Sequence, residues 1–377
     1  MSLPKTYIHS YNCITPLGFD IENTWNKLIQ NRSGLTENSS YDTATGIIDN
    51  EVLETNFRNN FPGKTPLTRL EKMIFLALLP LTKKHSVTKK SLLILSTTKG
   101  NISALQNHHT LPEEVFLHTS AKKIAQHFGF GTTPIVVSNA CVSGVMAVIV
   151  AKRLLQSGTY DNAFVIAADE VTSFVLSGFQ SFQALSKNLC KPFSSARDGI
   201  NIGEAAAAVY IDTQATPESF EILGEGSVND ANHISGPSRT GEGLFESILR
   251  CIKEAGIRPD DIDYISAHGT ATLYNDEMES IAFHRAGLQQ VPVNSLKGYF
   301  GHTLGTSGLL ELIVGLESAR NNTLIASMGS EDVGVSQTVN LIFENKKQNV
   351  NIVLKTASGF GGSNAAVLIK KLSGYEN

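Results

Sequence analysis

The order of expected elements along this chain repeats once, and this internal repeat restricts the fold more than any other feature of the sequence. Each copy contains an apolar run, a polar segment with helical periodicity, a second short apolar run and a turn of small residues that leads into a helix. The paired segments are 92–100 and 263–269, 119–129 and 275–287, and 134–140 and 291–295. The helices after the turns are similar in sequence, SGVMAVIVA at 143–151 and SGLLELIVG at 307–315. A strand closes each copy, GEAAAAVYI at 203–211 and GSNAAVLI at 362–369.

Strands that alternate with helices indicate parallel strand pairs joined by right-handed crossovers, so each copy is expected to form a sheet covered by helices. The helices after the two turns are apolar on most faces, which predicts that they lie between layers. The alternative is that two helices rich in alanine and glycine agree by chance. We predict a duplicated α/β fold of five layers, αβαβα, with pseudo-twofold halves at 1–211 and 222–377. The 377 residues then form one duplicated unit rather than two or three average domains.

Composition excludes several classes of protein. The formal net charge of −4 gives no general attraction to nucleic acid or to an anionic membrane. The N-terminal segment lacks the basic and apolar blocks of a signal peptide, and no apolar run approaches the roughly 18 residues that span a bilayer. We therefore expect a cytoplasmic protein. Its four cysteines lie far apart, without the spacing of a disulfide framework or a zinc site: Cys13, Cys141, Cys190 and Cys251.

Cys141 lies in SNACVSG at 138–144, where an apolar strand turns through small residues into a long helix. The unpaired N–H groups and the dipole at a helix N-terminus favour a thiolate, the nucleophilic form of cysteine. This arrangement is similar to a nucleophile elbow. The alternative is a small buried hydrophobic residue, which is the commoner role of a cysteine among apolar neighbours.

The equivalent turn in the second copy, at 294–308, contains Lys297 and His302. If the halves pack about a pseudo-twofold axis, the two turns face each other and His302 lies near Cys141. His268 follows the strand DYISA at the carboxyl end where open α/β sheets bind ligands. One cysteine and two histidines are therefore expected at related strand ends, whereas the remaining histidines are interpreted as structural.

Four motifs occur in a fixed order along the chain: NAC at 139–141, HGTAT at 268–272, KGYFGH at 297–302 and GFGGSN at 359–364. In this order they resemble the motifs of the elongating β-ketoacyl-acyl-carrier-protein synthases of the thiolase superfamily. The resemblance covers nearly the whole chain. It implies a thiolase-like version of the duplicated five-layer fold and an acyltransferase that makes carbon–carbon bonds.

The resemblance implies a catalytic set of Cys141, His268, His302 and Lys297. Cys141 would accept an acyl group from the phosphopantetheine thioester of an acyl carrier protein. His268 and His302 would stabilise the enolate that forms when a malonyl thioester loses carbon dioxide, and Lys297 would support the histidines. Neither a metal nor a redox cofactor is required.

The resemblance also assigns supporting roles. Glu311 matches an acidic partner in the family. Thr270 and Thr272 would contact the pantetheine arm, Phe179 would wall the acyl pocket, and Phe360, between glycines, would gate it. The backbone N–H groups of Cys141 and Phe360 would bind the oxyanion of the condensation step.

The resemblance implies an acidic carrier protein as partner, together with a homodimer or, alternatively, a heterodimer. Residues 64–90 contain seven lysines or arginines and one glutamate, a net charge of +6 that could steer such a partner. The alternative is an ordinary solvated helix face.

Departures from the family pattern leave the substrate open. Cys141 follows Gly100 by 41 positions, which is short for this family, and Phe182 and Gln183 stand where a small residue and an arginine are usual. These changes favour a specialised polyketide or polyene pathway over central fatty-acid elongation. The alternative function is a non-catalytic subunit similar to a chain-length factor, although such subunits generally lose the cysteine. A degradative thiolase is disfavoured because no cysteine follows Cys251.

Overall fold

The computed structural model describes residues 3–63, 67–107, 111–230 and 236–372. One eleven-stranded sheet extends through both halves of the chain. In spatial order its strands are β13 (Asn340–Leu341), β11 (Pro292–Asn294), β10 (Tyr264–Ser266), β15 (Ile352–Gly359), β16 (Ser363–Lys371), β9 (Phe220–Asn229), β1 (Tyr7–Ile14), β8 (Ala205–Asp212), β6 (Asn162–Asp169), β4 (Ser91–Ser96) and β5 (Ile135–Val137).

The strand order is the same in the two halves. Outward from the centre, the first half places β1, β8, β6, β4 and β5, and the second half places β9, β16, β15, β10 and β11. The halves join where β1 pairs antiparallel with β9, through Tyr7 opposite Glu221 and Ile8 opposite Phe220. The connection from β8 to β9 lies at 213–219, in the interval between the predicted halves 1–211 and 222–377. This duplicated architecture confirms the predicted fold class.

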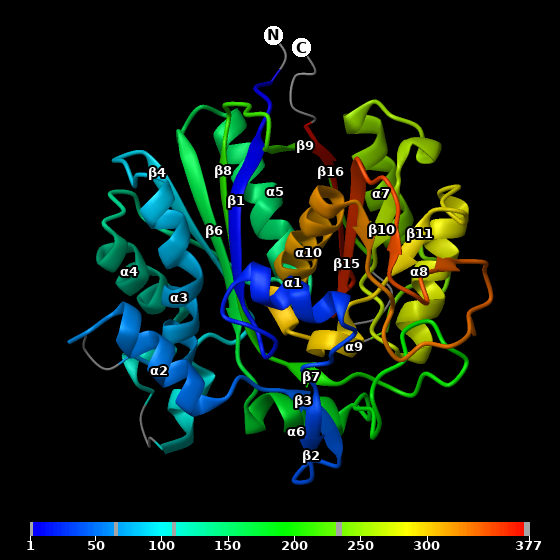
Figure 1. Ribbon diagram of the computed structural model, residues 1–377, viewed down its shortest axis with the longest axis horizontal. Helices are drawn as coiled ribbons and strands as arrows, with labels where there is room; N and C mark the ends of the chain where they lie inside the picture. The colour runs from blue at the N-terminus through cyan, green and yellow to red at the C-terminus, as the bar shows by residue number, and fades with distance from the viewer. Residues whose placement is uncertain (1–2, 64–66, 108–110, 231–235, 373–377) are drawn as a thin grey trace.

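Two helices lie between the halves of the sheet, α5 (Ser143–Gln156) and α10 (Ser307–Asn321) (Figure 1). Helices α3 (Arg69–Lys84) and α4 (Leu117–Phe128) cover the outer face of the first half, and α7 (Glu242–Ala255) and α8 (Leu273–Arg285) cover that of the second (Figure 1). All five layers of the prediction are therefore present. The central helices begin at Ser143 and Ser307, the two serines that the repeat aligned.

Close contact between the central helices requires glycine. A Cβ atom on Gly144 would lie 2.6 Å from the backbone nitrogen of Leu309, and one on Gly308 would lie 2.8 Å from a methyl group of Val145. Residues Ser307–Ala319 of α10 are all buried, as expected for a helix enclosed between the two halves of the sheet.

The parallel strands of both halves end near one another. Strand β4 pairs parallel with β5 and β6 in the first half, and β10 pairs parallel with β11 and β15 in the second. The turns after β5 and β11 therefore leave the sheet at carboxyl ends, where ligands bind in α/β folds. The smaller elements are α1 (Ile21–Ile29), β2 (Thr36–Asn38), β3 (Thr43–Gly46), α2 (Asn50–Asn60), α6 (Ser173–Ser181), β7 (Ile202–Gly203), α9 (Lys297–Phe300), β12 (Thr323–Leu324), β14 (Lys346–Lys347) and the 3₁₀ turns Ile102–Asn107, Glu113–Val115, Pro259–Asp261 and Leu304–Thr306.

Within the described part of the chain, none of the helices has the length and apolar character needed to cross a membrane.

Candidate active site

Cys141 lies in a sharp turn between β5 and α5. Ala140 adopts a left-handed conformation with φ of 44°, which reverses the chain just before the cysteine. The side chain of Ser143 fastens the turn, because its Oγ accepts a hydrogen bond from the N–H of Asn139 (2.7 Å) and donates one to the carbonyl oxygen of Ala140 (2.6 Å). Cys141 is 8% exposed. The structure therefore has the strand, turn and helix that the sequence predicted around this residue.

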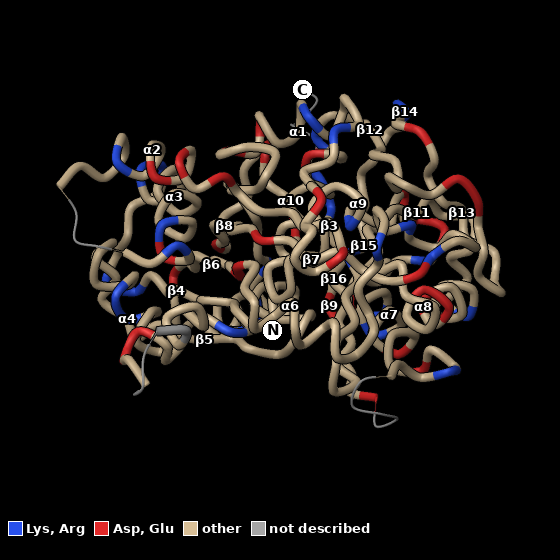
Figure 2. Tube along the Cα trace, turned by 90° about the horizontal axis from the view of Figure 1, so that it is seen from below, with Lys and Arg blue, Asp and Glu red and all other residues tan. Residues whose placement is uncertain are grey.

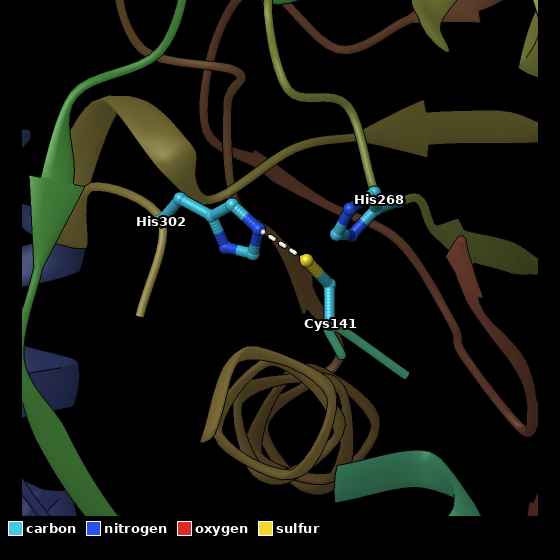
Figure 3. A group of neighbouring side chains, drawn as sticks. All are labelled: Cys141, His268 and His302. Carbon is cyan, nitrogen blue, oxygen red and sulfur yellow. Dashed lines mark hydrogen bonds between the residues drawn. The ribbon is translucent and has the colours of Figure 1, made fainter. Parts of the chain in front are cut away.

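The second turn places His302 against this sulfur. The Nε2 atom of His302 lies 3.0 Å from the Sγ atom of Cys141, as Figure 3 shows. Gly301 precedes the histidine with φ of 71°, and a Cβ atom there would lie 2.9 Å from the backbone nitrogen of Gly203. Close packing of these two backbones thus fixes the direction in which His302 leaves α9.

His268 completes the group from the loop after β10. Its ring centroid lies 5.1 Å from that of His302, with the two planes nearly perpendicular at 82°. The Cys141 sulfur and one nitrogen of each histidine lie within 4.8 Å of one another. These three atoms would also suit a soft divalent ion such as Zn²⁺. The chain folding thus brings together all three side chains that the sequence singled out.

Burial keeps this group uncharged at rest. Burial raises the pKa of the Cys141 thiol to about 11, and the nearby Lys297 ammonium opposes this only in part. Burial also lowers the pKa of His268 and of His302 well below the usual value, and Lys297 adds to both shifts. The raised pKa disagrees with the expectation of a thiolate stabilised by the helix N-terminus, because desolvation opposes the helix dipole. These shifts favour a neutral thiol beside a neutral imidazole.

Ser307, which the sequence analysis did not select, holds the other side of the His302 ring. The Nδ1 atom of His302 lies 2.9 Å from the Ser307 Oγ, which also accepts a hydrogen bond from the N–H of Thr303 at 3.0 Å. A hydroxyl group can donate or accept, so Ser307 is compatible with either tautomer of His302. The sequence signal that could have identified Ser307 was its position five residues after His302, at the start of α10.

Lys297 and Glu311, both predicted, form a buried ion pair. The Lys297 Nζ also donates to the carbonyl oxygen of His268 at 2.9 Å. A second buried lysine, Lys355, donates to the other carboxylate oxygen of Glu311 at 2.6 Å. Sequence reasoning missed Lys355, although a lysine inside the apolar strand IVLKTA was a visible signal. Glu311 is therefore shared by two ammonium groups.

Two buried carboxylates on α8 were also missed. Glu279 accepts hydrogen bonds from the N–H groups of His268 (2.8 Å) and Gly269 (2.6 Å), and burial raises the pKa of Glu279 to about 7. Asp276 accepts from the N–H of Phe193 at 2.7 Å, and burial raises the pKa of Asp276 to about 6. Their spacing of three residues on one helix face was the signal that could have identified them.

A cavity of about 420 Å³ opens above Cys141. Thr270 and Thr272 lie in its wall with their hydroxyl oxygens 2.9 Å apart, so the predicted pantetheine contacts line the same cavity as the nucleophile. Its wall includes Phe179, Phe182, Gln183, Asp198, Asp230, Pro237, His268, Leu273, Tyr274, Met278, His302 and Asn364.

Phe360 stands at the mouth of this cavity and is 40% exposed. Its ring stacks near Phe179, with centroids 6.0 Å apart, and meets Phe182 edge-on at 5.6 Å. Gly361 and Gly362 follow with φ of 85° and 79°. The Phe360 backbone acts on the Cys141 sulfur and lowers the pKa of the thiol, against the larger effect of burial. This loop therefore reaches the nucleophile through its backbone and the entrance through its side chain.

Of the basic segment 64–90, the described residues 67–90 do not line the cavity. Lys64 lies outside the described residues. Arg69 pairs with the buried Glu204, and Lys72 pairs with Glu54, so these two cations are neutralised locally. Figure 2 likewise shows basic and acidic segments close together along α2 and α3. Lys90 precedes the first residue of β4, whereas the site lies at the carboxyl end of that strand. An ordinary solvated helix face fits the described part of this segment.

Sequence comparison identifies relatives along the same regions. The β-ketoacyl synthase N-terminal domain matches residues 92–216 and the β-ketoacyl synthase C-terminal domain matches residues 219–331. A putative mitochondrial 3-oxoacyl-[acyl-carrier-protein] synthase of Schizosaccharomyces pombe is 24% identical over 98% of this chain and 99% of its own length. 3-Oxoacyl-[acyl-carrier-protein] synthase 2 of Rhizobium meliloti is 30% identical, over 63% of this chain and 61% of its own length.

Solved structures have the same fold. The structure of a ketosynthase in complex with its chain length factor from Xenorhabdus doucetiae matches with a TM-score of 0.85 and 26% identity, over 97% of this chain and 98% of the matched chain. A β-ketoacyl synthase from Burkholderia phymatum matches with a TM-score of 0.84 and 21% identity, over 98% and 99% of the two chains. With both family domains matched in sequence, and with cysteine and histidines gathered at the carboxyl ends of a duplicated sheet, this chain belongs to the β-ketoacyl synthase family of acyl-transferring condensing enzymes.

Proposed function

We propose that this protein is a β-ketoacyl-acyl-carrier-protein synthase that condenses an acyl group held on Cys141 with a malonyl group held on an acyl carrier protein. The observation that carries the proposal is the 3.0 Å contact between the Cys141 sulfur and the His302 Nε2, with His268 facing the same cavity. A nucleophile paired with a base is the arrangement required for covalent acyl transfer. The substrates are carried on phosphopantetheine, so the reaction uses no further cofactor.

The first stage is acyl transfer. The thiol proton of Cys141 passes to Nε2 of His302, and the resulting thiolate attacks the carbonyl carbon of the acyl thioester. The backbone N–H groups of Cys141 and Phe360 are proposed to bind the oxyanion. The carbon–sulfur bond to phosphopantetheine then breaks, the pantetheine thiolate takes the proton from His302, and the acyl group remains on Cys141.

The second stage is decarboxylation. The bond between the malonyl carboxylate and the methylene carbon breaks, carbon dioxide leaves, and the electron pair forms an enolate on the thioester oxygen. N–H groups of His268 and His302 are proposed to donate to that oxygen. His302 therefore acts as an acceptor in the first stage and as a donor in the second, after exchange with solvent water moves its proton from Nδ1 to Nε2. The Ser307 hydroxyl can bond to Nδ1 in either tautomer.

The third stage is condensation. The enolate carbon attacks the acyl carbonyl on Cys141, forming the new carbon–carbon bond. The bond to the Cys141 sulfur breaks, the thiolate takes a proton from Nε2 of His302, which regains one from solvent water, and the β-ketoacyl product leaves on the carrier protein. Lys297 and Glu311 support the histidines, Thr270 and Thr272 contact the pantetheine arm, and Phe360 gates the cavity.

Partners and pathway are part of the same proposal. We propose an acyl carrier protein as the substrate carrier and a homodimer as the assembly, in fatty-acid or specialised polyketide or polyene biosynthesis. The Xenorhabdus doucetiae relative in complex with its chain length factor supports a heterodimer as the alternative assembly. A non-catalytic, chain-length-factor-like role is disfavoured because it would leave the Cys141–His302 pair without a function.

The test is incubation with acyl-carrier and malonyl-carrier proteins, followed by intact-mass and product analysis. We expect an acyl adduct on the wild-type protein, its absence from Cys141→Ala, and a β-ketoacyl product. Full condensation by Cys141→Ala would refute the proposed nucleophile. A wild-type chain that takes no acyl group, alone or with a partner subunit, would support the non-catalytic role.

A further inference from the structure

The backbone that carries His268 is held by buried charges on both sides. Lys355 donates from Nζ to the carbonyl oxygens of Ser266 and Ala267, both at 3.1 Å, and Lys297 donates to that of His268 at 2.9 Å. Three consecutive carbonyl groups are thus bound by two ammonium groups. On the other side, the Glu279 carboxylate accepts from the N–H groups of His268 and the next residue.

This arrangement replaces the contact that usually orients a functional histidine. The Nδ1 atom of His268 is buried and has no hydrogen-bond partner among the residues that the structure describes. The ring therefore takes its direction from the backbone and from packing, rather than from a side chain bonded to Nδ1. Whatever holds the backbone at residues 266–269 consequently holds the ring.

The charges behind the histidines do not cancel within the lysine cluster. Lys297 and Lys355 have no exposed side-chain surface, and they share the single carboxylate of Glu311. Glu279 lies on the opposite side of the His268 backbone, and burial together with Asp276 raises the pKa of Glu279 to about 7. Two ammonium groups therefore share one carboxylate, which leaves one positive charge without a partner near the histidines. This charge is already in place when an anion forms there.

On this geometry we propose that Lys355 is a second positioning residue of the site: with Lys297 it fixes the backbone at His268 and supplies positive charge that favours the enolate. The inference rests on the proposed function and assigns to it a residue outside the predicted catalytic set. Lys355 reaches the reacting atoms through the His268 backbone and through its field, and it does not touch them.

The positions of charges predict a split between the reaction stages. Lys355 contributes to the lowered pKa of His302, after burial and Lys297, and to that of His268, after burial, Lys297 and His302. The cations that act on Cys141 are Lys297 and Lys99. Decarboxylation should therefore depend on Lys355 more than acyl transfer does.

The charged or titratable groups around the histidines are Cys141 in the turn before α5, Asp169 on β6, Asp276 and Glu279 on α8, Lys297 on α9, Glu311 on α10, Lys355 on β15, and Lys99 after β4.

The test compares Lys355→Met with Lys152→Met in the full-length protein. Lys152 is also a buried lysine with a carboxylate partner, Glu254, but it lies on α5 far along the helix from Cys141, so it controls for the loss of any buried ion pair. We expect Lys355→Met to acylate Cys141 within about threefold of the wild-type rate and to release carbon dioxide from malonyl-carrier protein about tenfold more slowly. Lys152→Met should match the wild type in both assays.

A second readout needs no substrate. In protein with isotope-labelled histidine, assigned by means of His268→Ala and His302→Ala, loss of the nearby positive charge should raise the titration midpoints of both rings by about one pH unit in Lys355→Met. A chain that failed to condense at all would refute the proposed function but would still yield this measurement. Unchanged midpoints and unchanged carbon dioxide release, relative to Lys152→Met, would overturn the assignment of Lys355.

Lys355→Gln separates charge from hydrogen bonding, since the amide can still donate to a carbonyl group. The proposal expects it to lose decarboxylation as Lys355→Met does. If both Lys355 variants failed to fold while Lys152→Met folded, Lys355 would belong to the stability of the fold, and the proposal would also be overturned.

Discussion

The pH dependence of Cys141 alkylation separates a neutral thiol from a thiolate at the resting site. With a pKa of about 11, about one Cys141 in 10,000 is a thiolate at pH 7, compared with about 3% of a free cysteine with a pKa of about 8.5. Reaction with iodoacetamide at pH 7 should therefore be about 300-fold slower than for the free amino acid. Since only the thiolate reacts, the rate should rise about tenfold per pH unit from pH 7 to pH 10.

The assay is mass spectrometric counting of alkylated Cys141 over time, with Cys141→Ser as the background for the three other cysteines. Those three are buried, so they should contribute little. The slope with pH is the decisive quantity, because restricted access to the cavity slows the reaction equally at every pH. A rate that stops rising between pH 5 and pH 8 would show a thiolate paired with a protonated histidine. That result would refute the reasoning that desolvation outweighs the helix dipole here.

The remaining predictions concern residues that hold the site. Ser307→Ala should slow acyl transfer about tenfold, since it removes the hydroxyl bonded to Nδ1 of His302, and single-turnover acylation would measure it; an unchanged rate would contradict the role of the hydroxyl. Glu311→Gln should lower the free energy of unfolding by about 3–5 kcal/mol in urea titrations, because two buried ammonium groups lose their shared carboxylate; a loss below about 1 kcal/mol would contradict the ion pairs. Gly362→Ala should destabilise the fold by clearly more than Gly361→Ala. Both residues have positive φ, but only at Gly362 would a Cβ atom meet backbone, 1.7 Å from the carbonyl oxygen of Asp230, so equal losses would contradict this packing.

The internal repeat predicted most of the elements that carry the site. The paired segments became β4 and β10, α4 and α8, β5 and β11, and α5 and α10. The sequence similarity between the two copies indicated these pairs, because duplicated halves keep the same pattern of buried residues in corresponding elements. The junction of β1 with β9 was not visible, since it depends on two residue pairs across the centre of the molecule rather than on any local periodicity.

The site could be predicted as far as its motifs extend and no further. Cys141, His268 and His302 each follow a strand, so topology alone places them at one edge. Glu279 and Lys355 were missed because both lie outside the four motifs, and the apolar run around Lys355 or the spacing of Asp276 and Glu279 indicates burial without indicating a partner. Each acquires its role only when a neighbouring element covers it, α8 against the His268 loop and α10 against β15.

The disagreement between the expected thiolate and the raised pKa of Cys141 follows from the same limit. A helix N-terminus can be identified in sequence, and its dipole is worth up to about 2 kcal/mol in partly buried geometries. The desolvation of Cys141 depends on the loop of Phe360 and the second half of the chain, which close over the sulfur only after folding. A rise of the pKa from about 9 to about 11 corresponds to about 3 kcal/mol, more than the dipole supplies.

A neutral pair at rest suits the chemistry that the fold supports. In a buried thiolate–imidazolium pair, the thiolate would already interact with the positive charges of Lys297 and Lys355 before any substrate arrived. With thiol and imidazole neutral, that positive charge remains available until acyl transfer or decarboxylation creates an anion within the site. Interactions that form only as charge develops lower the barrier rather than stabilising the ground state. Desolvation of the sulfur therefore slows spontaneous alkylation. It also preserves the difference between the electrostatic stabilisation of the developing anion and that of the resting site, on which catalysis depends.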